Sequence, residues 1–93
     1  MRVQTEINRH LKRGRGDLAR NVIRRELRQT PQDHWLMKKM AQAYAVDGRL
    51  WNALRWSGRA LTLEPDCPIA CWDRAGILFM LGRDADAVLA RAR

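Results

Sequence analysis

The chain has 93 residues, of which 46% are hydrophobic and 30% charged, and its 18 Lys or Arg against 10 Asp or Glu give a formal net charge of +8. A chain of this length forms one domain with a thin core and has little room for a deep pocket. The sequence shows no secretory signal, its longest apolar run (77–81) is far too short to cross a membrane, and two cysteines are too few for a disulfide scaffold, so we expect a cytoplasmic protein with reduced thiols.

The positive charge is concentrated in the first third of the chain. Residues 1–30 carry nine basic and three acidic residues, a net +6, and the other 63 carry nine and seven, a net +2. Such a segment attracts phosphate, anionic lipid or acidic protein. Arginine is also a good helix former, so a solvated helix face explains the same pattern.

A period of 34 residues runs through the chain. It is carried by Gly-Arg pairs at 14, 48 and 82, by alanines at 19, 53 and 87, and by prolines at 31 and 65. A period of this length is typical of solenoids, in which each repeat is one supersecondary unit that buries its apolar face against its neighbours. We therefore predict an all-α fold of helix-turn-helix units.

The first unit is predicted to contain helices near 2–13 and 17–29, with Gly14 at the turn and Ile23 among the apolar positions. In phase with the other units, its first helix places Glu6 at an apolar position. A shift by one residue instead places Ile7 and Leu11 on the apolar stripe, so the register of this helix stays open.

The middle unit has the clearest pattern. Met37, Met40, Ala41 and Tyr44 fall at i, i+3, i+4 and i+7, which predicts a helix over 33–46 with one apolar face. Gly48 is suited to end it. A second helix is expected over 50–63, because a proline follows at position 65.

The third unit is predicted to contain helices near 68–80 and 84–92. Pro68 is suited to the first turn of a helix. The packing stripe is expected to hold Cys71, Ala75 and Leu78, with the turn at Gly82. The array ends before a capping helix, so an exposed end with Leu78, Val88 and Leu89 as candidates would adjoin further repeats, a partner, or a second copy in a homodimer.

These residues resemble the tetratricopeptide repeat family, whose pattern is Trp-x2-Leu-Gly-x2-Tyr, then Ala-x3-Phe, then Pro. The middle unit matches at Tyr44, Ala53 and Pro65, and Ser57 replaces the phenylalanine. In the third unit, Arg74 stands where leucine is usual. The resemblance implies a right-handed alpha-alpha superhelix of about 2.5–3 repeats. One domain, 1–93, would then contain repeats at approximately 1–33, 34–67 and 68–93, the last incomplete.

The resemblance also implies a concave groove lined by the first helix of each repeat, which binds a peptide or helix of another protein. Aromatic side chains beside lysines would suit such a site, although they could instead pack between helices. The expected function is that of a non-catalytic adaptor or chaperone-like module whose ligand carries acidic residues. The expected groove residues are Asn8, Lys12, Trp35, Lys38, Lys39, Gln42, Trp72, Asp73 and Phe79.

An alternative is the binding of nucleic acid or another polyanion through the basic first repeat, where Arg20, Arg24 and Arg28 share one helix face. An enzyme is not expected, because no nucleophile and base stand in a recognisable arrangement. Cys67 and Cys71 are interpreted as structural, because His10 and His34 lie in other repeats and a metal needs three or four ligands. No cofactor is expected.

Overall fold

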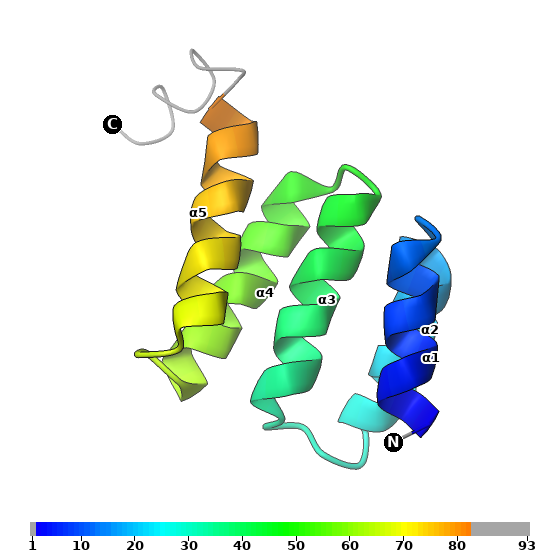
Figure 1. The fold of residues 1–93 in the computed structure, drawn as a ribbon. Coiled ribbons are helices and arrows are strands. Elements are labelled where there is room, and N and C mark those ends of the chain that lie inside the picture. The colour runs from blue at the N-terminus through cyan, green and yellow to red at the C-terminus, as the bar shows by residue number, and fades with distance from the viewer. Residues whose placement is uncertain (1, 83–93) are drawn as a thin grey trace.

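The computed structural model describes residues 2–82, which form five helices and no strand (Figure 1). The helices are α1 (Arg2–Lys12), α2 (Gly16–Leu27), α3 (His34–Val46), α4 (Leu50–Leu63) and α5 (Pro68–Gly82). The all-α prediction is confirmed for this part of the chain, and each helix begins and ends within two residues of its expected bounds. The sixth expected helix (84–92), with Val88 and Leu89, lies outside the described residues. Between residues 2 and 82, no helix has the length and apolar character needed to cross a bilayer.

The first two helix pairs reverse at glycines in the left-handed conformation. Gly14 has a φ of 74° and Gly48 a φ of 77°, values that residues with a Cβ rarely adopt. In both turns the arginine that follows the glycine donates its N–H to a carbonyl five residues earlier, which is the Schellman arrangement. These bonds are Arg15 N–H to His10 O at 2.8 Å and Arg49 N–H to Tyr44 O at 2.9 Å. The predicted turn glycines are therefore confirmed at 14 and 48, while Gly82 is the last residue of α5.

The helices lie in two layers. Each helix contacts the next along the chain, and α1 also contacts α3, as α3 does α5, whereas no contact joins α2 to α4 within residues 2–82. The helices α1, α3 and α5 thus form one layer and α2 and α4 the other (Figure 1). We call the exposed side of the first layer the odd-helix surface, and the outward sides of α2 and α4 the even-helix surface.

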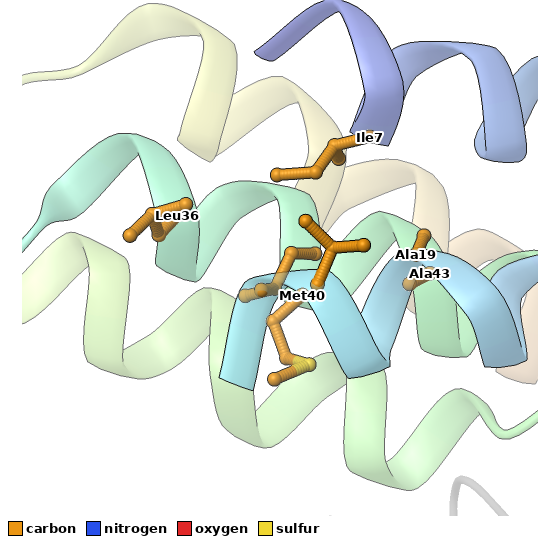
Figure 2. Packing of buried hydrophobic residues seen from close by; sticks show 7 residues of the cluster. Ile7, Ala19, Leu36, Met40 and Ala43 are labelled. Atoms are coloured by element: carbon orange, nitrogen blue, oxygen red, sulfur yellow. The ribbon is translucent and has the colours of Figure 1, made fainter. Parts of the chain in front are cut away.

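The main core lies between the first three helices. It contains seven buried side chains, of which Figure 2 labels five: Ile7, Ala19, Leu36, Met40 and Ala43. The other two are Val22 and Ile23. Alanines at the crossings let the helix backbones approach closely, and Ala19 and Ala53 are both fully buried, as the 34-residue period predicted. A smaller cluster of Ala53, Ile77 and Leu81 joins α4 to α5.

The structure decides the register of α1. Ile7 is fully buried, and Val3 and Leu11 pack against the same cluster from one turn on either side. Glu6 lies at the edge of this stripe, 3.8 Å from the imidazole of His10. The stripe of residues spaced by four therefore faces the core, and Glu6 keeps its carboxylate near solvent.

Arg20 of α2 holds the end of α3. Helical spacing alone had placed this residue in a candidate polyanion site. Arg20 of α2 is only 8% exposed. Its guanidinium forms an ion pair with Asp47 and donates to the carbonyl of Ala43 at 3.4 Å. It also lies 4.7 Å from the centre of the Tyr44 ring. A cation at a helix C-terminus is favoured by the helix dipole, so Arg20 serves the packing of α2 on α3.

The predicted packing stripe of α5 was wrong. Cys71, Ala75 and Leu78 are exposed, whereas Ala70, Ile77 and Leu81 are buried. Among residues 2–82, the apolar surface available to α5 is that of α4 and α3. The side of α5 that carries Ala70 and Ile77 therefore packs against these two helices.

Arg74, which stands where an apolar residue was expected, is accommodated by polar contacts. Its guanidinium donates to the carbonyl of Leu54 in α4 at 3.3 Å. Gly58 lies beside it, and a Cβ added there would be in ordinary contact with the guanidinium, at 3.5 Å. The buried hydroxyl of Ser57 donates to the same carbonyl at 2.8 Å.

Candidate functional site

The odd-helix surface brings four of the nine predicted site residues into one chain of contacts. The ammonium of Lys39 lies 5.2 Å from the centre of the Trp35 ring. The same group donates to the side-chain oxygen of Gln42 at 3.3 Å. The amide nitrogen of Gln42 in turn donates to the carboxylate of Asp73 at 3.3 Å. These contacts follow one side of α3 and cross to α5, so they tie the two helices together along this surface.

The charge of Lys39 is partly withdrawn from solvent. Burial lowers its pKa, the positive charge of Lys38 lowers it further, and the carboxylate of Asp73 raises it. A cation–π contact and a hydrogen bond already engage its ammonium. Lys38, one residue earlier, is half-buried. Of the two predicted lysines, Lys39 therefore mainly contacts its neighbours in the same chain.

A pocket of about 210 Å³ lies between α3 and α5. Its lining residues are Gln42, Ala45, Trp72, Asp73, Gly76, Ile77 and Met80. Gly76 leaves it open, because a Cβ at this position would meet no atom within 4 Å. Sites for drug-sized ligands enclose about 300–1,000 Å³, so this volume suits one or two side chains of a protein ligand better than a small molecule.

One wall of the pocket is apolar and exposed. Trp72 is 80% exposed, and Ile69 and Met80 on the same side of α5 are 57% and 41% exposed. Phe79, two helical turns after Trp72, is 70% exposed. A tryptophan that leaves most of its surface in water contributes little to the stability of its own chain. Trp72 is thus not packed between helices, the alternative that the sequence left open.

Trp35 lies at the other end of the odd-helix surface. It packs against the main core cluster and borders a second, smaller hollow of about 170 Å³ with Val3, Gln4 and Leu36 among its neighbours. Trp35 and Trp72 therefore line different hollows. Asn8 and Lys12 of α1 are both exposed and border neither hollow.

Two features of this surface were not predicted from the sequence. Ala45 and Ile77 line the pocket, and the Gln42–Asp73 hydrogen bond lies on its polar side. Helical spacing gave no sign of the bond, because its partners are 31 residues apart in different repeats. Ala45 carries no chemistry that would single it out.

The cysteines and histidines do not gather. Within residues 2–82, no group of three His, Cys, Asp or Glu side chains could hold a metal ion. Cys67 and Cys71 are free thiols. His34 lies within 3.0 Å of the carbonyl of Ala60 through Nδ1, and its Nε2 is buried with no hydrogen-bond partner in the described part of the chain. This contact joins the start of α3 to the end of α4.

Comparison of the chain with protein-family models, curated proteins and solved structures gives no match.

Proposed function

We propose that this chain is a non-catalytic protein–protein interaction module of the tetratricopeptide type, which binds a helix or extended segment of a partner on its odd-helix surface. The observation that carries the proposal is the exposure of Trp72, at 80%, on the wall of the pocket between α3 and α5. Exposed aromatic side chains beside a pocket are typical centres of protein interfaces. The two Schellman turns spaced by 34 residues support the repeat architecture.

The chemistry of the surface defines the ligand. An apolar side chain of the partner would enter the pocket beside Trp72 and Met80, where a polar neighbour could reach the Gln42–Asp73 pair. Lys38 stands one turn of α3 before Gln42, so an acidic residue of the partner would be attracted to that end. Such a charge contributes more to the association rate than to the affinity.

Peptide display tests the proposal without requiring that the natural partner be identified. Peptides are selected on the intact chain, and the binding of one selected peptide is measured by fluorescence anisotropy. Trp72→Ala should weaken binding by about tenfold or more, a loss typical of an interface hot spot. Gly76→Leu should do the same by filling the pocket, since the space over Gly76 is open.

A matched variant on the even-helix surface controls for general effects. Trp51→Ala removes a 44% exposed tryptophan of α4. It should leave peptide affinity unchanged, and Lys38→Gln should lower mainly the association rate. If neither Trp72→Ala nor Gly76→Leu weakens any selected peptide, the odd-helix surface is not the binding site.

The alternative function, polyanion binding through Arg20, Arg24 and Arg28, loses one of its three arginines. Arg20 is buried in its ion pair with Asp47, and Arg24 donates to the hydroxyl of Tyr44 at 3.3 Å. Only Arg28 is both exposed and without such an inter-helix contact among residues 2–82. Helix α2 therefore does not present a stripe of three exposed arginines to a polyanion.

A further inference from the structure

The even-helix surface carries a different set of arginines from the one that the sequence suggested. Arg55 and Arg59 are exposed one turn apart on α4, which has no acidic residue between its first and last positions. On α2, Arg25 is exposed, and Arg28 follows at the end of the helix. Within residues 2–82, neither Arg25, Arg28 nor Arg55 forms an ion pair that would neutralise it.

Acidic side chains interrupt this surface little. Asp17, at the start of α2, is paired with Arg15 at 3.2 Å, and that guanidinium lowers the pKa of the carboxyl. Glu26 is half-buried on another side of α2, and Glu64 comes after the end of α4. The four arginines of the even-helix surface therefore present uncompensated positive charge on the side opposite the peptide pocket.

The type of cation is informative. The lysines of the chain are Lys12, Lys38 and Lys39, all in α1 or α3, so every basic residue of α2, α4 and α5 is arginine. The guanidinium is planar, remains charged at all accessible pH values and binds phosphate oxygens in pairs. It also stacks on aromatic rings, as Arg59 does over Trp56 at 4.6 Å.

An open hollow of about 440 Å³ lies at the junction of α4 and α5, lined by Trp51, Leu54, Arg55, Gly58 and Arg74. Trp51 is 44% exposed. Arg74 is held at the wall by its bond to the carbonyl of Leu54, and Gly58 leaves the floor without a side chain. An indole and two guanidinium groups that line one hollow match the two parts of a nucleotide, because bases stack on aromatic rings while phosphates bind arginine.

We infer that the even-helix surface binds single-stranded nucleic acid, with one nucleotide in the hollow of Trp51, Arg55 and Arg74 and adjacent phosphates on Arg59, Arg25 and Arg28. A membrane fits this surface poorly, because binding to a bilayer requires several exposed apolar side chains on one side of a helix. In α2 and α4, Trp51 is the one large hydrophobic residue that is exposed. An acidic protein segment would form ion pairs with the arginines, but its carboxylates would not stack on the exposed indole of Trp51.

The first experiment measures the binding of a fluorescent oligothymidylate of about 15 nucleotides to the intact chain across a series of salt concentrations. The double variant Arg55→Gln/Arg59→Gln should bind roughly 25-fold more weakly at about 0.1 M salt, because each lost phosphate contact changes log K by about 0.7 per decade of salt. Lys38→Gln/Lys39→Gln removes the same charge from the odd-helix surface and should change affinity by less than about threefold. Equal losses in the two double variants would overturn the inference.

The second experiment separates stacking from charge. Trp51→Ala should weaken the binding of the oligonucleotide by roughly tenfold and leave the salt dependence unchanged, since stacking is not electrostatic. Circular dichroism checks that each variant is folded. Equally tight binding of polyglutamate, of phosphatidylserine vesicles or of the matching duplex would overturn the assignment to single strands, as would an oligonucleotide affinity insensitive to Arg55→Gln/Arg59→Gln.

Discussion

The two ends of the helical array within residues 2–82 differ in how their apolar side chains are covered. Around α1, α2 and α3, residues such as Ile7, Ile23 and Met40 are fully buried, and the Arg20–Asp47 ion pair closes the contact between α2 and α3. At α5, the small cluster around Ile77 holds one side of the helix, while Trp72 and Phe79 on another side are 80% and 70% exposed.

This difference separates residues that maintain the fold from residues available for recognition. A buried side chain in a close-packed cluster gains its transfer free energy and its dispersion contacts within the chain. A large apolar side chain that leaves most of its surface in water, as Trp72 does at 80% exposed, gains little transfer free energy from folding. The first three helices therefore contain the better-covered core, and the exposed apolar side chains on which the proposed function depends lie on α5.

The largest expected effect tests whether the two clusters differ in stability. Met40→Ala removes a fully buried side chain from the main cluster and should lower the free energy of unfolding by about 4 kcal/mol, near the upper end for such changes. Ile77→Ala, in the smaller cluster, should cost about 2 kcal/mol because its surroundings can collapse more easily. Urea denaturation followed by circular dichroism measures both. Equal losses would show that α5 is as firmly packed as α3.

The ion pair at the end of α3 gives the next prediction. Asp47→Asn leaves the guanidinium of Arg20 buried without a counter-ion. We expect a loss of about 2 kcal/mol, below the roughly 3–5 kcal/mol typical of fully buried pairs, because the Asp47 side chain is 25% exposed. Asp17→Asn is the control, since its pair with Arg15 is more than half exposed on both sides and should contribute nothing measurable. A similar small effect of both variants would contradict a structural role for Arg20.

The smallest expected effects come from two glycines. A Cβ on Gly16 would lie 2.3 Å from the carbonyl oxygen of Ala43, a backbone atom that cannot move aside cheaply. Gly16→Ala should therefore destabilise the chain by about 1.5 kcal/mol. Gly76→Ala meets open space inside α5 and should stabilise it by up to about 1 kcal/mol through helix propensity. Thermal unfolding measures both signs, and a destabilising Gly76→Ala would mean that the pocket needs glycine for another reason.

Much of the local structure follows from the sequence. Gly14 and Gly48 precede an arginine at the same 34-residue interval and both adopt positive φ, because only glycine enters that region at little cost. The apolar stripe of α3 was identified from helical spacing, since its pattern is regular and the helix is covered on that side by its neighbours. Helix bounds followed from prolines and from the turn glycines. The structure adds the cap of α3, where the carboxylate of Asp33 accepts from the N–H of Leu36 at 3.1 Å.

Other features were decided by the tertiary structure alone. The sequence placed Arg20 with Arg24 and Arg28 by spacing, but the position of Asp47 at the end of α3 draws Arg20 into the interior. The same reasoning placed Cys71 on the packing side of α5, whereas the apolar surface of α4 selects Ile77 and Leu81. Periodicity shows which residues share a helix face, but the direction of that face depends on neighbours brought together by folding. The 34-residue period therefore determined the helices and their turns, while the packing of α2 on α3 and of α5 on α4 decided which residues remain available for binding.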